Sequence, residues 1–494
     1  MTLKKTPVQN NIDIDYSLKA PGYVFSIWVI QMVIHLYKDT SAGFRTLSNI
    51  MKVLSLYINV PVMSYNSIKG WVLRYGYHIL TRKKEKRNDN VFINDFSIQL
   101  GQQKCLLVLR APLNKMRKEG FNLSHEQAEV IDLKVVKKTG HQLVATSLEE
   151  SASQAGMPKQ IVSDWGADIK KGNINFCVNH PDVVYNYDIG HKTACMLKAL
   201  LEKNDQWKSL LEDINKTLMS VQQTELSFLR PILPRKKSRY LNISVLIYWV
   251  QNILRFKDKK DFTSINSGPG YVLNPEYLSK IDFKSSFNGS SGEISKLATR
   301  IFQDKEEAIE TLNSVTGNDI KVEESDVICL GNKRFIEKFI IFEKYREFID
   351  DLSSMVSMIN SIHYHVKHKG LSINTMDIID KSISYNQIIG EKTKQIFLQM
   401  VNFLNHEIAK FGSDTSAFLG SSDIIESVFG KYKYKLTDRL GSIHSSILFL
   451  SVICATLNPE DIMEATKYKL SDIKNWFENM QNEKTMQVKR REAF

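Results

Sequence analysis

Two aspartates stand close together in the segment IVSDWGADIKKG, residues 161–172. An apolar run ends at Asp164, a glycine follows two residues on, and Asp168 comes one helical turn later. One interpretation is an ordinary connection from a strand to a helix, in which an acid lies at the helix start. The other is a metal-binding carboxylate at the end of a buried strand. The segment alone leaves both open.

Another acid occupies a position where a charge is unfavourable. Asp95 lies in the middle of VFINDFSIQL, residues 91–100, whose composition otherwise predicts a strand. A carboxylate inside a strand costs free energy unless it is paired or binds a cation. Asp95 is therefore a second candidate metal ligand.

A third candidate lies near the C-terminus, in GSSDIIESVFGKYKYKL, residues 420–436. A serine at 421 or 422 can cap a helix on which Asp423 and Glu426 stand three apart, on one face. Glu426 is either the glutamate of a capping box or a metal ligand, and the spacing does not separate the two.

The elements that must position these acids follow residue 90. They are, in chain order, strands at 91–100, 105–112 and 129–138, a helix at 146–157, a strand at 160–164, a short helix at 172–181, a strand at 183–189 and a helix at 191–203. Three antiparallel strands followed by strands joined through helical crossovers form a ribonuclease H-like α/β core with a mixed five-stranded sheet. The first and fourth strands of that sheet are neighbours, so we expect Asp95 and Asp164 to lie side by side.

Two carboxylates that close raise each other's pKa and attract a divalent cation. With oxygen ligands alone the ion should be Mg²⁺, with Mn²⁺ as a substitute. No GxxxxGK[ST] motif is present, so the sequence indicates no use of ATP.

The rest of the chain reads as mostly helical and suggests four regions. Residues 1–90 form a helical region, in which a helix at 40–58 is followed by a capped helix at 64–80. The second helix carries Lys69, Trp71 and Arg74, which suggests a DNA-binding helix-turn-helix. A plain helical hairpin fits the pattern equally well. The remaining regions are the catalytic core at 91–204, a large all-α insertion at 205–414, and a helical C-terminal part of the core with a basic tail at 415–494.

Bulk composition narrows the class of protein. The chain has 494 residues, 43% of them hydrophobic, and a formal charge of +12, which favours a polyanionic partner such as nucleic acid. Its five cysteines form no CxxC pairs, and its two longest apolar stretches are short for a membrane span. With no signal-peptide pattern, we expect a cytoplasmic protein of bacterial type, associated with the nucleoid.

The segments VFINDFSIQLGQQKCLLVL, IVSDWGADIKKG and GSSDIIESVFGKYK, in that order, resemble the three acidic motifs of a DDE transposase of a bacterial insertion sequence. The third resembles the hAT-type signature through Ser421, Ser422, Glu426 and Phe429, with Ser427 where hAT enzymes usually carry arginine. A long helical insertion before the glutamate is a further similarity.

The resemblance implies that Asp95, Asp164 and Glu426 are catalytic ligands of two Mg²⁺ ions. It implies DNA strand cleavage and strand transfer at transposon terminal inverted repeats, joining to target DNA, and a homodimer or higher assembly on DNA. Two alternatives stay open: a structure-specific nuclease on the same core without strand transfer, and a non-catalytic DNA-binding protein descended from a transposase.

Several further residues are candidates of lower rank. His191 corresponds to a histidine near the active site of hAT-like enzymes, or it is a capping or core histidine. Asp168, Asp188 and Asp423 are possible outer partners of the metal site. The lysines of GKYKYKL could follow a DNA backbone, or form a solvated face: Lys431, Lys433 and Lys435.

Three other polar groups could suggest function, but each has a simpler explanation. Cys177 with His180, and His363 with His365 and His368, could indicate zinc, but a polar helix face explains them better. PRKKSRY, residues 234–240, could contact DNA or be a solvated basic segment.

Overall fold

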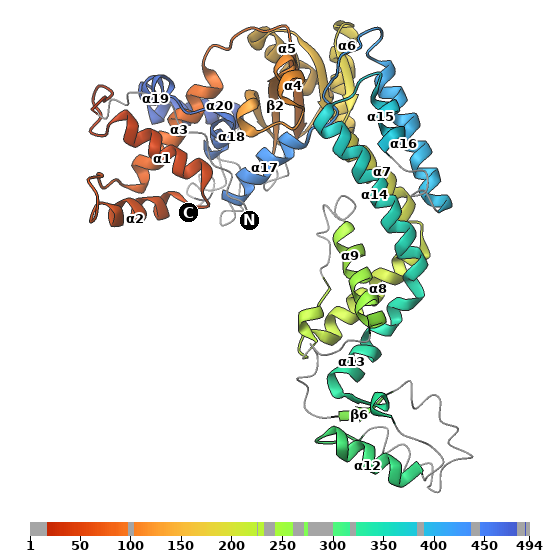
Figure 1. The fold of residues 1–494 in the computed structure, drawn as a ribbon. Coiled ribbons are helices and arrows are strands. Elements are labelled where there is room, and N and C mark those ends of the chain that lie inside the picture. Colours follow the sequence, from red (N-terminus) through yellow and green to blue (C-terminus); the bar gives the residue numbers. More distant parts are fainter. Residues whose placement is uncertain are drawn as a thin grey trace. The chain divides into compact units, whose positions relative to one another are not determined.

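The computed structural model describes residues 17–96, 103–224, 226–231, 243–259, 271–274, 300–316, 323–382, 390–435, 445–481 and 490. The basic segment 234–240 and the turn after residue 96 lie outside these residues. The chain divides into two compact units (Figure 1). Unit 1 contains residues 1–192, 362–381 and 401–494, and unit 2 contains 193–361 and 382–400, so the division falls within α7, α14 and α16.

Unit 1 holds the sheet and the helices around it. In chain order its elements are α1 (Ile27–Asp39), α2 (Phe44–Leu54), α3 (Tyr65–Thr81), β1 (Asn90–Phe96), β2 (Lys104–Pro112), α4 (Leu113–Glu119), β3 (Glu129–Val136), α5 (His141–Ala155), β4 (Pro158–Ser163), α6 (Ala167–Asn179), β5 (Val184–Tyr187), the start of α7 (Ile189–Leu201), the end of α14 (Arg346–Lys369), α15 (Thr375–Ser382), the end of α16 (Glu391–Ala409), α17 (Asp423–Lys435), α18 (Phe449–Cys454), α19 (Pro459–Thr466) and α20 (Leu470–Gln481).

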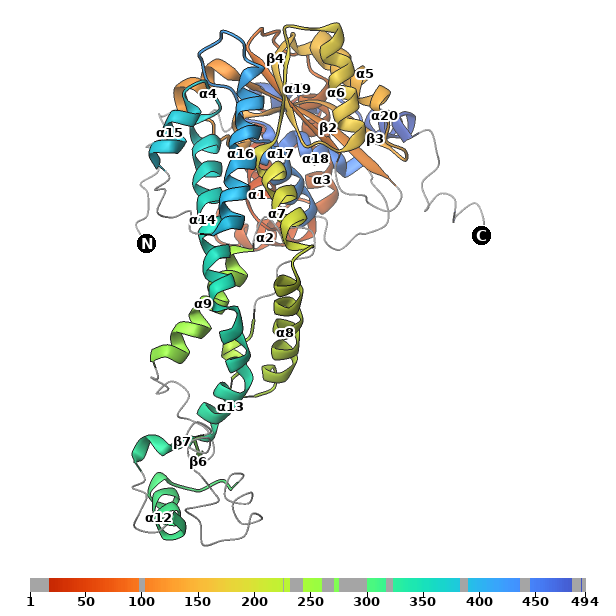
Figure 2. The ribbon, with the colours of Figure 1, turned by 90° about the vertical axis from the view of Figure 1, so that its right-hand side faces the viewer.

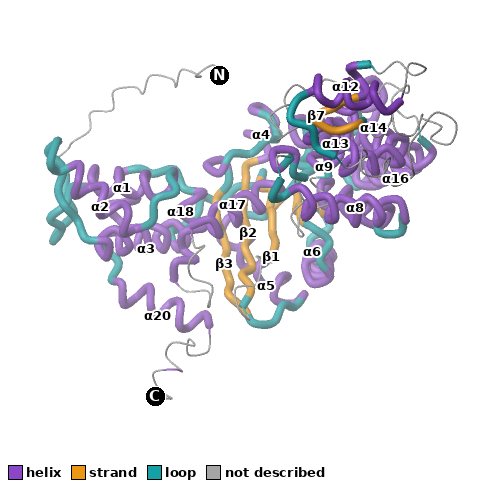
Figure 3. Tube along the Cα trace, turned by 90° about the horizontal axis from the view of Figure 1, so that it is seen from below, coloured by secondary structure: helices purple, strands orange, loops and turns teal. Residues whose placement is uncertain are grey.

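The five strands have the order β3-β2-β1-β4-β5. Strands β1, β2 and β3 are antiparallel, whereas β4 pairs parallel with β1 and with β5. Figure 3 shows β3, β2 and β1 side by side. The mixed five-stranded sheet with the order of a ribonuclease H-like core was predicted from the sequence, and it is confirmed; the short helix α4 was not predicted.

Apolar side chains alternate between the two faces of this sheet. Phe92, Val108 and Ile161 belong to the core cluster beneath α5 and α6, on one face. The helices α17, α18 and α3 pack against the other face. Because side chains alternate along a strand, Asp95 and Asp164 project from the face that α17 covers.

The N-terminal helices form one bundle with the C-terminal helices α18, α19 and α20. Helix α3 runs through the middle of that bundle: Trp71 is only 5% exposed, and the Arg74 Nε donates to the Tyr468 carbonyl at 2.8 Å. A recognition helix must offer its side chains to a DNA groove. Trp71 and Arg74 are instead engaged inside the bundle, and Lys69 is half-buried on the same helix, so a DNA-binding role of these three residues stays a prediction.

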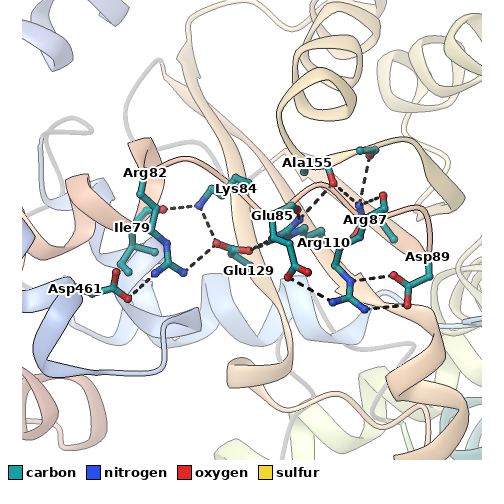
Figure 4. Close-up of polar contacts among 12 residues, drawn as sticks. Ile79, Arg82, Lys84, Glu85, Arg87, Asp89, Arg110, Glu129, Ala155 and Asp461 are labelled. Atoms are coloured by element: carbon teal, nitrogen blue, oxygen red, sulfur yellow. Dashed lines mark hydrogen bonds and ion pairs between the residues drawn. The ribbon is translucent and has the colours of Figure 1, made fainter.

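Buried charges join this bundle to the sheet (Figure 4). The Glu129 carboxylate at the start of β3 accepts from Lys84 at 3.0 Å and from the Arg110 Nε at 2.8 Å. Arg82 bridges Glu129 and Asp461 of α19, at 3.3 and 2.5 Å. Each carboxylate faces guanidinium or ammonium groups, so the network satisfies its own charges.

Unit 2 is mostly helical. Its described elements are the rest of α7, α8 (Asp205–Val221), α9 (Ser244–Lys259), β6 (Tyr271–Leu273), α12 (Lys305–Thr316), β7 (Val327–Cys329), α13 (Leu330–Phe339) and the first parts of α14 and α16. The short strands β6 and β7 pair antiparallel and share a core with α12, which lies beside them in Figures 1 and 2. Across the described residues, none of the helices has the length and hydropathy needed to cross a membrane.

Candidate active site at the carboxyl ends of β1 and β4

Asp95 and Asp164 lie at equivalent positions of two neighbouring strands. The parallel register pairs Ile93 of β1 with Val162 of β4, and each aspartate stands two residues further along the chain, Asp95 within β1 and Asp164 directly after β4. Adjacent strands are about 4.8 Å apart, and residues two apart on a strand share a face. The two aspartates therefore stand abreast on the face covered by α17.

Buried amides and hydroxyls fix the ends of both strands from the opposite face. Asn94 and Asn173 of α6 exchange hydrogen bonds at 2.8 and 3.2 Å, and Asn173 also donates to the Ser163 hydroxyl at 2.9 Å. Asn94 and Ser163 immediately precede Asp95 and Asp164. The side chain of Asn173 thus joins β1 to β4 directly behind the two acids.

The residues after Asp164 are anchored as well. The Trp165 ring stacks on Tyr187 of β5 with centroids 4.6 Å apart, and the Lys170 ammonium lies 3.8 Å from the Trp165 centroid. Because the Tyr187 ring covers one face of the Trp165 indole, the Lys170 ammonium lies over the other face. The Gly166 amide donates to the Asp164 Oδ1 at 3.1 Å, so the chain turns away beside that carboxylate.

Helix α17 brings Glu426 to the same place. The segment before it is held by Gln160, whose side-chain amide donates to the Leu419 carbonyl at 2.7 Å and whose oxygen accepts from the Leu419 amide at 2.9 Å. Asp188, at the end of β5, accepts from the backbone amide and, at 2.9 Å, from the hydroxyl of Ser422. These contacts fix the start of α17 against β4 and β5.

The charges of the three acids act on one another. Burial raises the pKa of Asp95 well above its usual value, and the negative charges of Asp164 and Glu426 raise it further. Burial likewise raises the pKa of Glu426, and the negative charges of Asp188, Asp423 and Asp164 raise it further. Ionising all three side chains together is therefore unfavourable unless a cation is present.

Two basic side chains lie near the acids, Lys433 on α17 and His191 on α7. Lys433 lies two turns after Glu426, on the same side of the helix, and its charge partly offsets the raised pKa of Asp95. His191 similarly lowers the pKa of Glu426. His191 thus lies near the acids, while its backbone amide donates to the Asp188 Oδ1 at 2.6 Å.

The acids ranked second have structural partners. Asp168, in the first turn of α6, accepts from the Thr139 hydroxyl at 2.5 Å. Asp188 is 3% exposed, and its two oxygens accept from His191 and Ser422. Burial opposes ionisation of Asp423, but the Lys367 ammonium, 2.6 Å away, holds the pKa of Asp423 below its usual value.

The three lysines near the end of α17 differ in the groups that they contact. Lys435 donates to the Ala42 carbonyl at 2.9 Å, and burial lowers its pKa to about 8. Lys431 lies 3.4 Å from Asp39. Both join α17 to the connection between α1 and α2, so of the predicted DNA contacts in this group only Lys433 faces the acids.

Several residues near the site were not singled out from the sequence. Asn94, Asn173, Gln160 and Trp165 act through packing that only the assembled sheet creates. Lys367 was missed within the segment HYHVKH, where only the histidines were considered.

The donor chemistry of the site fits a hard cation such as Mg²⁺, because all three candidate ligands are carboxylates. Among the described residues, however, no three side chains of His, Cys, Asp or Glu come close enough together to hold an ion as they stand. This includes the two groups considered for zinc; His180 instead pairs with Glu149 at 2.9 Å.

Comparison with solved structures gives two similarities. The Drosophila P element transposase strand transfer complex is 12% identical, over 85% of this chain and 94% of that chain, with a TM-score of 0.28. The simian T-cell lymphotropic virus intasome in complex with PP2A regulatory subunit B56 gamma is 12% identical, over 43% and 66%, with a TM-score of 0.16. No protein-family model and no curated protein matches the chain. At TM-scores this low the similarities carry no functional weight, and the function proposed below rests on the site itself.

Proposed function

We propose that this chain is a DNA transposase that cleaves and joins DNA strands by metal-dependent phosphoryl transfer. The supporting observation is the arrangement of Asp95 and Asp164, abreast at the carboxyl ends of adjacent parallel strands, with the charge of Glu426 acting on Asp95. Three mutually repelling carboxylates in a partly buried place cost stability unless they serve a cation.

Asp95, Asp164 and Glu426 are the residues that would hold Mg²⁺, two ions in all, with Mn²⁺ as a substitute. Bound ions would supply the Lewis acidity that activates water or a 3′-hydroxyl and stabilises the leaving oxygen of a phosphodiester. Since the side chains do not enclose an ion as they stand, the proposal includes their moving together when one binds.

The chain's own residues have defined tasks in this scheme. Because its pKa is raised, the Asp95 carboxyl holds a proton more readily than a free aspartate, and it must give up that proton to become a ligand. Asn173 and Gln160 keep the strand ends and α17 in position. Lys433, on the Glu426 side of α17, is placed to pair with a backbone phosphate of the bound DNA.

The proposed partners are transposon terminal inverted repeats and a target duplex, bound by a homodimer or larger assembly. The DNA that flanks the gene supplies the test substrate, since inverted repeats there would be the ends of the element. The assay incubates a plasmid carrying this DNA with the protein and Mg²⁺, and then a pre-cleaved end with a 3′-hydroxyl and a target plasmid.

We expect cleavage at the repeat ends and joined product, both lost in Asp95→Asn, Asp164→Asn and Glu426→Gln proteins that remain folded. Cleavage without joining would instead identify a nuclease on the same core. Binding without Mg²⁺-dependent cleavage in the natural protein would identify a non-catalytic DNA-binding protein.

A further inference from the structure

Helix α2 is a surface helix of unit 1 that is held from one side only. Leu47 and Met51 are 1% and 0% exposed and pack towards α3. The Ser48 hydroxyl donates to the Met63 carbonyl at 2.7 Å, which ties the helix to the start of α3. Figures 1 and 3 show α2 at the side of the helical bundle away from the sheet. Its opposite face is open to solvent.

That open face carries a stripe of polar side chains suited to DNA. Arg45, Asn49 and Lys52 are all exposed and stand at i, i+4 and i+7, so they follow one line along the helix. Arginine, lysine and asparagine are the residue types that read guanine and adenine edges in the major groove. The Arg45 guanidinium lies over the ring of Tyr65, the first residue of α3, 5.2 Å from its centre.

Apolar side chains flank the stripe. Val53 is 56% exposed and lies one turn after Asn49, and Ile50 is 39% exposed at the side of the helix next to Val53. The connection to α3 exposes more of them, including Leu56 and Tyr57 at 76% and 80%. An exposed apolar patch of this kind marks an interaction surface, and in a DNA groove such side chains contact thymine methyl groups.

The charge around α2 selects the partner. Residues 40–64, which form α2 and the connections on either side of it, contain two basic residues, Arg45 and Lys52, and no aspartate or glutamate. Among the described residues, no acidic side chain pairs with Arg45 or Lys52. Such a surface repels a second copy of itself and attracts a polyanion, and DNA is the polyanion on which the proposed function acts.

We propose that α2, and not the longer α3, is the helix that reads DNA sequence, with Arg45, Asn49 and Lys52 as its contacting residues. This inference rests on the proposed function in taking DNA as the ligand. It assigns sequence recognition to a surface distinct from the three carboxylates, so the two can fail separately.

The test is selection from a randomised double-stranded DNA library, without Mg²⁺, followed by titration of the enriched duplex at several salt concentrations. It compares the natural protein with the triple variant Arg45→Ala, Asn49→Ala, Lys52→Ala and with the single variant Asn49→Ala. The matched control removes an exposed lysine that follows α19, and an exposed lysine and asparagine of α20, in the same unit: Lys467→Ala, Lys474→Ala and Asn475→Ala.

We expect the natural and control proteins to enrich the same sequence. The triple variant should enrich none, and its salt slope should be smaller by about one to two, since about 0.9 is lost per phosphate contact. Asn49→Ala should relax selection at one position while leaving the salt slope unchanged. Circular dichroism checks that every variant is folded.

Two results would overturn the inference. One is selection of the same sequence with the same affinity by the triple variant, or selection of none by the natural protein. The other is loss of self-association in sedimentation by the triple variant with unchanged DNA selection, which would make α2 a protein interface. The natural protein could also select a DNA sequence through α2 and yet show no Mg²⁺-dependent cleavage. That result would refute the proposed function and leave this inference standing.

Discussion

Asp164 and Asp168 are four residues apart and have different surroundings. Asp164 projects beside Asp95 on the α17 face, whereas Asp168 accepts from Thr139 in the first turn of α6. An acid in that turn is favourable for the helix dipole alone. The structure therefore agrees with a structural acid in the first turn of α6 at 168 and supports, through position, the proposal of a ligand at 164.

This difference predicts different effects of the same chemical change. Asp164→Asn should lower the rate of Mg²⁺-dependent DNA cleavage by at least about 10³-fold, equivalent to about 4 kcal/mol. Asp168→Asn should leave the rate within about tenfold, because it keeps the shape of the side chain and one acceptor for Thr139. Single-turnover cleavage rates of the two variants measure this directly, and equal losses would contradict the assignment.

Asp95 allows a test of the metal that does not depend on catalysis. Because burial and two neighbouring acids raise its pKa, a cation that binds the folded protein should stabilise it, by RT ln(1 + [L]/Kd). We expect Mg²⁺ or Mn²⁺ to raise the melting temperature of the natural protein, and Asp95→Asn to abolish that rise. NaCl at the same ionic strength controls for general salt effects. An equal rise in the variant would place the ion elsewhere.

At the scale of the elements, side-chain hydrogen bonds hold the ends of the short strands β1 and β4 together. Asn173 of α6 does this by bonding Asn94 and Ser163 in the core. Gln160 does the same for α17 by pairing with both backbone groups of Leu419, as a neighbouring strand would. A catalytic carboxylate must be held to within a fraction of an ångström, so these amides bear on activity through geometry.

Replacing Asn173 should therefore affect both stability and activity. Asn173→Ala leaves the buried Asn94 side chain without its partner, whereas Ser163 keeps its bonds to Tyr185 and to the Asp164 carbonyl. The loss should lower the free energy of unfolding by about 1–3 kcal/mol. Cleavage measured well below the melting temperature should also fall, while affinity for uncleaved DNA stays unchanged. Lost stability with an unaltered cleavage rate would make Asn173 purely structural.

The network around Glu129 predicts a dependence of stability on pH. Burial opposes its ionisation, but Lys84 and Arg110 hold its pKa below the usual value. A depressed folded pKa means that the stabilisation is present above the unfolded value, about 4.3, and is lost as the pH falls through the folded pKa. Lys84 is almost fully buried, so it depends on this partner.

Glu129→Gln should accordingly cost about 3–5 kcal/mol at pH 7, because it leaves buried cations unpaired. Its unfolding free energy should also change less than that of the natural protein below about pH 4.3. Glu150→Gln is the control, since Glu150 pairs with Lys134 at the surface and should cost under about 1 kcal/mol. Denaturant titrations across this pH range measure both.

At the scale of the whole molecule, the proposed function predicts that the formal charge of +12 governs association with DNA. Affinity for a non-specific duplex should fall about 10³-fold or more between about 50 and 200 mM salt if six or more phosphates are contacted. Lys433→Ala should reduce the slope of log affinity against log salt by about one. Lys435→Ala should not, because Lys435 donates to Ala42 inside the bundle. Fluorescence anisotropy at several salt concentrations separates the two lysines.

The sequence by itself determined the sheet. Five strand segments, their order and the helices between them follow from local composition and periodicity, which are carried by consecutive residues. The same patterns placed Asp95 inside the first strand and Asp164 at the end of the fourth, and predicted that these two strands are neighbours, because the strand order of a sheet with crossover connections is strongly restricted.

Only the tertiary structure decided which surfaces are open and which side chains support the site. The local sequence pattern cannot distinguish a helix that binds DNA from a helix that packs against other helices. Here the C-terminal helices bury Trp71 and bond Arg74, although they are almost 400 residues away in sequence. Asn173, Gln160 and Lys367 likewise meet their partners only after the chain has folded. Residues distant in sequence decide which side chains are buried and which groups they bond. Burial and bonding in turn determine which polar side chains remain available for chemistry.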